Sequence, residues 1–75
     1  MGFGDELAKR RKAMNFTQRS LAIKCGIGYA TVAEYETYGG QNMKLMTARK
    51  ISHALDWPIV DMLRALEIVD ETQRD

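Results

Sequence analysis

Hydrophobic residues recur along this chain at the three-to-four-residue spacing of amphipathic helices, in five segments separated by polar stretches. The first segment is followed by Asn15 and the second by Gly26, and both residue types favour helix ends and turns. The pattern therefore predicts an all-α protein, with helices at about residues 4–14, 18–25, 29–37, 45–55 and 58–69.

The spacing also indicates which side chains of the first and fourth segments face inward. These are Leu7, Ala8, Arg11 and Met14 in the first segment and Leu45, Ala48, Ile51 and Leu55 in the fourth. Between the first two segments, Thr17 can cap a helix by accepting a hydrogen bond from a backbone N–H of the first turn. Phe16 precedes this cap and is placed to act as a hydrophobic staple. We therefore expect the second helix to begin at Gln18.

Residues 18–36, QRSLAIKCGIGYATVAEYE, join two short helical patterns through a Gly-Ile-Gly turn. Helices that cross at roughly 90 to 120° approach closely near such a turn, so the small Ala22 suits the contact. Gly26 can take the positive φ that a tight helix end requires. One inner face then continues through both helices, formed by Leu21, Cys25, Ile27, Val32 and Tyr35. This is the sequence form of a helix-turn-helix.

The spacing of four residues in this stretch resembles that of a known family. Gln18, Ala22, Gly26 and Val32 are separated by three, three and five residues. The Cro and phage-repressor-like, or XRE-type, helix-turn-helix family of DNA-binding domains has this pattern. The resemblance covers about residues 4–63 and implies a compact five-helix, lambda-repressor-like domain.

The resemblance also implies one structural pair, and the sequence shows two departures from the family. An ion pair is expected between Arg11, late in the first helix, and Glu36, at the end of the second helix of the motif. Met43 stands where proline is usual, and Gly28 replaces the usual Ser or Thr cap. A Gly cap costs only a few tenths of a kcal/mol relative to better caps, so we expect the fold to tolerate it.

Length and composition limit the possible classes of protein. Seventy-five residues suit one domain over residues 1–75, with a core at about 4–66 and a helix extension or frayed tail at 67–75. A domain this small is only marginally stable alone, so dimerisation would help. The single cysteine excludes an internal disulfide. No apolar run reaches about 18 residues and no signal-peptide pattern opens the chain, so we expect a cytoplasmic protein without a membrane partner.

Charge is unevenly divided along the chain, although the net value is only +1. Residues 1–50 carry nine Lys or Arg and four Asp or Glu, a net charge of +5. Residues 51–75 carry two basic and six acidic residues, a net charge of −4. Such a division favours a basic surface toward a polyanion and an acidic end facing away from it.

In a helix-turn-helix, the N-terminal part of the second helix enters the DNA major groove. The residues expected to reach base edges are therefore Gly28, Tyr29, Ala30, Thr31, Ala33 and Glu34. None of them is Arg, Asn or Gln, the residue types that commonly make bidentate contacts to guanine or adenine. We expect modest or partly indirect sequence readout, and for each side chain a merely solvated surface is the alternative.

Phosphate contacts need only donors and positive charge. Gln18 combines a side-chain amide with the free N–H groups of a helix N-terminus, and the resemblance gives this position a phosphate contact. The other residues expected to contact phosphates are Arg10, Arg19, Asn42 and Lys44.

The fifth predicted helix is more apolar than one buried face requires. Excess exposed apolar surface usually marks an association site, so we expect a two-fold dimer interface; completion of a small core is the alternative. The interface residues expected are Trp57, Ile59, Val60, Met62, Leu66 and Val69.

Catalytic chemistry is not indicated by the residue pattern. His53 has no Cys or acidic pair at metal-ligand or catalytic spacing, and Cys25 occupies an inward packing position. We therefore expect no enzyme activity, no metal and no cofactor.

The function expected from these observations is sequence-specific transcription regulation, with double-stranded DNA as the partner. We expect a homodimeric repressor at a pseudo-palindromic operator. One alternative is a small controller or antitoxin-type protein of a restriction-modification or toxin operon. Another is a protein-interaction module with the same fold, which would bind a protein partner.

Overall fold

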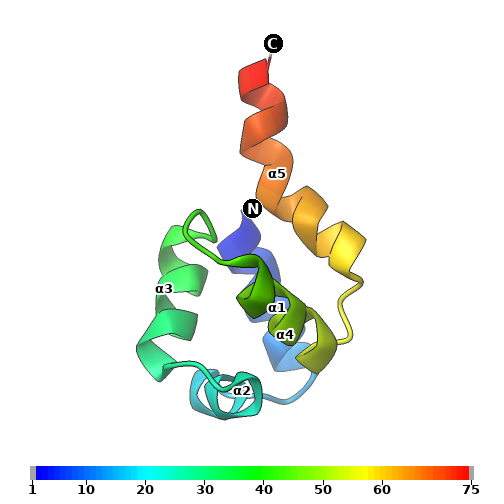
Figure 1. The fold of residues 1–75 in the computed structure, drawn as a ribbon. Helices are drawn as coiled ribbons and strands as arrows, with labels where there is room; N and C mark the ends of the chain where they lie inside the picture. Colours follow the sequence, from blue (N-terminus) through cyan, green and yellow to red (C-terminus); the bar gives the residue numbers. More distant parts are fainter. Residues whose placement is uncertain (1, 75) are drawn as a thin grey trace.

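The computed structural model describes the backbone of residues 2–74 and the side chains of residues 2–66. Within this part of the chain all regular structure is α-helical (Figure 1). The helices are α1 (Phe3–Ala13), α2 (Gln18–Cys25), α3 (Tyr29–Tyr38), α4 (Leu45–Ala54) and α5 (Ile59–Arg74). The predicted all-α, five-helix class is confirmed, and α5 continues to Arg74 through most of the expected extension.

The helix ends follow from local chemistry. The Thr17 hydroxyl accepts a hydrogen bond from the Ser20 N–H at 2.9 Å, and the Ser20 hydroxyl accepts one from the Thr17 N–H at 2.9 Å. This reciprocal capping box starts α2 at the expected residue. Gly26 ends α2 in the left-handed region at φ 69°. Asn15 (φ 64°) and Asp56 (φ 52°) lie in the same region after α1 and α4, because short polar side chains tolerate it.

The hydrophobic core lies where the helices cross. Its members are Phe3, Leu7, Leu21, Ala22, Cys25, Val32, Tyr35, Ala48, Ile51, Leu55, Trp57 and Met62. Ile27 packs against this core and is half-buried. Two predicted inward positions were wrong. Met14 is 45% exposed because it follows the last residue of α1, and Leu45 is 61% exposed because it is the first residue of α4, at the edge of the buried face.

The two helices of the motif, α2 and α3, pack against each other and against other helices of the domain. α1 packs against α3, α2 contacts both α3 and α4, and α4 packs against α5. Gly4 permits the close approach of α1 and α3, since a Cβ there would collide with the Glu36 carbonyl and lie 2.9 Å from the Tyr35 carbonyl oxygen. The packing of α3 against α1 therefore requires a residue without a side chain at position 4.

Aromatic and loop contacts hold the first half of α5, while its C-terminal end extends away from the other helices (Figure 1). The rings of Phe3 and Trp57 stack at a centroid distance of 5.5 Å. Gly40, in the connection between α3 and α4, lies so close that a Cβ would be 2.5 Å from Leu66 Cδ2. These contacts join the α4–α5 connection to the start of α1 and α5 to the α3–α4 connection, away from the turn between α2 and α3.

Candidate nucleic-acid interface

The N-terminal ends of α2 and α3 border an open groove of about 600 Å³. Helix α3 begins after Gly28, whose backbone is extended (φ −75°) and which has no side chain to cap the helix. The first turn of a helix has N–H groups without intrahelical partners, and these attract anions. The residues that line the groove are Arg11, Phe16, Thr17, Gln18, Arg19 and Tyr29.

Arg11, one of the residues that line this groove, forms an ion pair between α1 and α3. Arg11 Nε donates to Glu36 Oε2 at 2.5 Å and Arg11 Nη2 donates to Glu36 Oε1 at 3.1 Å. Arg11 Nη1 also donates to the Phe16 carbonyl at 2.9 Å. The pair expected from the sequence is therefore present, and its arginine also holds the connection between α1 and α2.

Gln18 is joined to the same carboxylate. Its Nε2 donates to Glu36 Oε1 at 2.9 Å, so the end of α3 fixes the orientation of an amide at the start of α2. An amide NH₂ carries two donors, and this bond uses one of them. Nothing in the sequence spacing indicated the Gln18–Glu36 bond, because it depends on how the two helices cross.

Arg19 and Tyr29 form a second link between the two helices. The Arg19 guanidinium carbon lies 5.4 Å from the centroid of the Tyr29 ring, within the range of a cation–π contact. Both side chains are exposed, Tyr29 by 50%. The sequence assigned them to separate sets, one for phosphate and one for bases, whereas the structure brings them together.

The outward face of α3 is short of hydrogen-bond donors. Among the expected base readers besides Tyr29, Gly28, Ala30 and Glu34 are exposed, and Thr31 and Ala33 are half-buried. Helix α3 contains no Lys, Arg, Asn or Gln, and its charged residues are both glutamates. This face of α3 is therefore mostly uncharged, and it carries one exposed carboxylate, that of Glu34.

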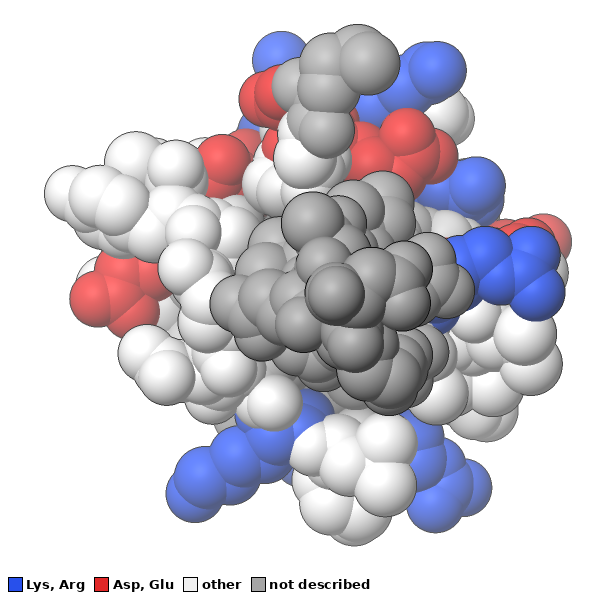
Figure 2. Space-filling view, turned by 90° about the horizontal axis from the view of Figure 1, so that it is seen from above, with Lys and Arg blue, Asp and Glu red and all other residues white. Residues whose placement is uncertain are grey.

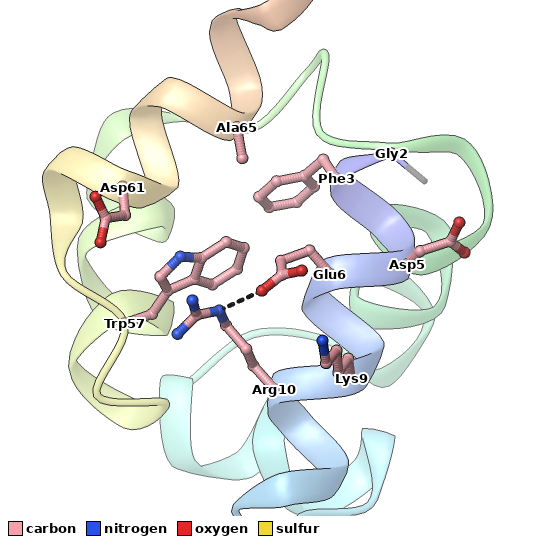
Figure 3. Close-up of a pocket in the computed structure, with 9 residues that line it drawn as sticks. All are labelled: Gly2, Phe3, Asp5, Glu6, Lys9, Arg10, Trp57, Asp61 and Ala65. Carbon is pink, nitrogen blue, oxygen red and sulfur yellow. Dashed lines mark hydrogen bonds and ion pairs between the residues drawn. The ribbon is translucent and has the colours of Figure 1, made fainter.

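The structure separates Arg10 from the other expected phosphate contacts. Arg10 Nε forms an ion pair with Glu6 Oε2 at 2.7 Å, and its guanidinium carbon lies 4.7 Å from the centroid of the Trp57 ring. Figure 3 shows this arrangement in a pocket of about 490 Å³ between α1 and α5. Arg10, expected among the phosphate contacts, therefore does not line the α2–α3 groove, since α1 turns this side chain toward Trp57 and α5.

Asn42 and Lys44 are exposed in the connection between α3 and α4, and Lys44 is the residue immediately before α4. Figure 2 shows basic side chains at separate places around the rim of the molecule in that view, with acidic or uncharged side chains between them. On this face the positive charge does not form one continuous patch.

Two of the residues expected at a dimer interface belong to the core. Trp57 and Met62 are 2% and 0% exposed, so placing them at an interface was wrong: the chain itself covers both side chains. Val60 is 60% exposed, while Ile59 and Leu66 are half-buried. The side chain of Val69 lies outside the described residues.

The remaining chemically reactive residues do not gather at a common place. Cys25 is 4% exposed, and burial raises the pKa of its thiol despite the nearby Lys50 and Lys24. His53 is exposed on α4. Among the described residues, no three His, Cys, Asp or Glu side chains are grouped as a metal site would require. In the same part of the chain no helix has the length and apolar character needed to cross a membrane.

The crossing of α2 and α3, the left-handed Gly26 between them and the groove at their N-terminal ends define a helix-turn-helix domain. A helix-turn-helix family model matches residues 7–62, and the chain belongs to this helix-turn-helix family. Over 72 residues it is 29% identical to a protein of Methanocella arvoryzae that carries the provisional name HTH-type transcriptional regulatory protein. That alignment covers 96% of this chain and 22% of the relative, so the chain spans about a fifth of the relative's length.

Proposed function

We propose that this chain binds DNA sequence-specifically as a two-fold dimer and represses transcription in the cytoplasm. The observation that supports this most directly is the α2–α3 groove, which is lined by Tyr29 at the start of α3 and by Gln18, whose amide is bonded to Glu36 near the end of α3. In the docking of a helix-turn-helix, the N-terminal part of the second helix enters the major groove and the first helix crosses the backbone. The groove then faces the DNA.

The proposed contacts divide into positioning and reading. Gln18, Asn42 and Lys44 contact phosphates. Asn42 and Lys44 are exposed, and Gln18 lines the groove with its amide bonded to Glu36. Phosphate contacts position a protein on DNA and do not read the base sequence directly. The proposed base contacts come from Gly28, Tyr29, Ala30, Thr31, Ala33 and Glu34 at the start and on the outer face of α3. Methyl groups of Ala and Thr suit thymine, and the Glu34 carboxylate suits cytosine N4.

The proposed dimer uses the apolar surface of α5. Val60 is exposed there, and Ile59 and Leu66 are partly exposed. A two-fold pair of domains would place two recognition helices about 34 to 36 Å apart, which matches half-sites one turn of DNA apart. A dimer on such an operator represses transcription by blocking the polymerase.

Selection of bound sequences from a random DNA pool, at a stated salt concentration, tests the proposal. We expect enrichment of a pseudo-palindromic motif and an affinity that falls steeply with salt, with a log-log slope of about −0.9 for each phosphate neutralised. Binding without any enriched motif, or an enriched motif without two-fold symmetry, would contradict sequence-specific binding by a dimer.

A second candidate function is protein interaction through the same fold, as in an antitoxin or adaptor. The observation that favours it is the outward face of α3, which carries Glu34 and no basic residue. An apolar protein interface keeps its affinity as salt rises, whereas a phosphate-contacting surface loses it. Salt-independent binding to a partner protein and no affinity for DNA would favour this second function.

A further inference from the structure

We propose that Arg19, on α2, reads a guanine base beside Tyr29 and supplies the specific donors that α3 lacks. This inference rests on the proposed DNA-binding function and names the base and the residue at one position of the operator. It gives Arg19 a different role from the phosphate contact expected from the sequence.

The argument begins with the donors available in the groove. Guanine presents two acceptors, O6 and N7, in the major groove, and the forked guanidinium of arginine matches both. Helix α3 contains no arginine. Two arginines line the α2–α3 groove, and the guanidinium of Arg11 is already bonded to Glu36 and Phe16. Arg19 is the other.

Arg19 is exposed, and within the described region its contact is with an aromatic ring and not with a carboxylate. A cation–π contact needs no hydrogen bond from the guanidinium to an oxygen acceptor, so the N–H donors of Arg19 can still bond a ligand. Arg10, in contrast, directs its Nε to Glu6. The donors of Arg19 are therefore available to a ligand in the groove.

The position of the Tyr29 ring indicates where the N–H donors of Arg19 lie. Tyr29 is the first residue of α3, the end of the recognition helix that enters the major groove in the proposed docking. Stacking on this ring brings a side chain of α2 toward the bases that α3 would reach. Gln18 already occupies the N-terminus of α2, where a phosphate would bind. Arg19 thus contacts the guanine, and Tyr29, in addition to its own proposed base contact, acts as a positioning residue that holds the guanidinium in place.

The test uses the DNA site that the wild-type protein selects. Each guanine is replaced in turn by 7-deazaguanine, which lacks the N7 acceptor, and affinities are measured for the wild type and for Arg19→Ala. At one guanine of each half-site we expect the wild type to lose affinity about ten-fold and Arg19→Ala to lose less than about two-fold. Tyr29→Phe keeps the ring and should keep the guanine preference, whereas Tyr29→Leu should weaken it.

Arg49→Ala is the matched control, because Arg49 is an exposed arginine on α4 and does not line the groove. It should retain the preference for guanine. Circular dichroism should show unchanged folding for Arg19→Ala, since the Arg19 side chain is exposed.

The results of this test distinguish a failure of the proposed Arg19 role from a failure of the proposed DNA-binding function. Failure of the wild type to select any motif would overturn sequence-specific binding itself. A selected motif without guanine, or equal 7-deazaguanine penalties for the wild type and Arg19→Ala, would overturn the role of Arg19 and leave DNA binding intact.

Discussion

Arg11 of α1 and Glu36 of α3 form a two-point ion pair whose side chains are 10% and 9% exposed. Glu36 also accepts a hydrogen bond from Gln18, and Arg11 donates one to the Phe16 carbonyl. Burial of charge is favourable only where both partners are present and well bonded. The pair therefore makes the stability of the domain depend on both residues.

We predict that Arg11→Ala and Glu36→Ala each lower the free energy of unfolding by about 3 to 5 kcal/mol, because each leaves a buried charge without its partner. Urea denaturation followed by circular dichroism measures this change. Lys12→Ala removes an exposed charge from the same helix and should change stability by less than about 0.5 kcal/mol. Near-wild-type stability of either charge-removed variant would contradict a structural role for the pair.

The two glycines of the turn should respond in opposite directions. Gly26→Ala should cost about 1 to 2 kcal/mol, because alanine is strained at φ 69° even though no atom lies within 4 Å of a Cβ there. Gly28→Ser should stabilise the protein by a few tenths of a kcal/mol, since its backbone suits a cap and a Cβ would lie 3.5 Å from Thr31 Oγ1. Thermal unfolding of both variants tests this, and equal shifts in Tm would contradict it.

Gly4→Ala should destabilise the protein by about 1 to 3 kcal/mol, because the added methyl group would push α1 away from the α3 backbone. Gly2→Ser is the control, since a Cβ at that position has no neighbour within 4 Å. Chemical denaturation of both variants would show the difference. A Gly4→Ala variant as stable as wild type would mean that the two helices do not require this close approach.

Ionisation of Cys25 should weaken the fold at high pH. Burial raises the pKa of this thiol above its ordinary value of 9.0, so the unfolded chain loses the proton at a lower pH than the folded one. The contribution is complete below about pH 9 and is lost as the pH rises through the folded pKa. Burial, followed by the nearby Glu34, also raises the pKa of Tyr35, which adds a loss above about pH 10.

Unfolding free energies of wild type and Cys25→Ala, measured from about pH 8 to pH 10.5, isolate the cysteine. The wild type should lose more stability over this range, while the loss due to Tyr35 is common to both proteins. Parallel pH profiles would show that the thiol does not contribute.

Val60→Asp should prevent dimerisation, because it places a carboxylate on the exposed apolar surface proposed as the interface. Sedimentation equilibrium at tens of micromolar should show a wild-type dimer and a monomeric variant with unchanged helicity. Met46→Asp, at another exposed apolar position, should remain dimeric. A monomeric wild type would rule out this dimer.

Structural features that depend only on residues close together in the sequence were predicted correctly. Thr17 caps α2 and Gly26 takes a positive φ because each role is decided within one turn of chain. The inward positions of Val32 and Tyr35 follow from helical spacing and are likewise correct. Spacing failed at helix ends, where Leu45 has too few neighbours to be covered.

Contacts between side chains from different helices could not be predicted in the same way. The cation–π contacts of Arg10 with Trp57 and of Arg19 with Tyr29 depend on helix crossing angles and side-chain rotamers, which hydrophobic periodicity does not contain. The need for glycine at position 4 likewise appears only when α3 is placed beside it. For this reason the helix-turn-helix scaffold was predictable, while the division of roles among the arginines was not.

The two interactions of Glu36, with Arg11 and with Gln18, affect how the sequence of such a domain can change in evolution. Because one carboxylate bonds both Arg11 and the Gln18 amide, a mutation at position 36 changes the stability of the fold and the orientation of this amide together. Arg19 and Tyr29 are exposed and lie outside that network, so they can be exchanged at little cost to the fold. In the proposed docking on DNA, new sequence preferences can therefore arise at these two positions without a change in the Arg11–Glu36–Gln18 network.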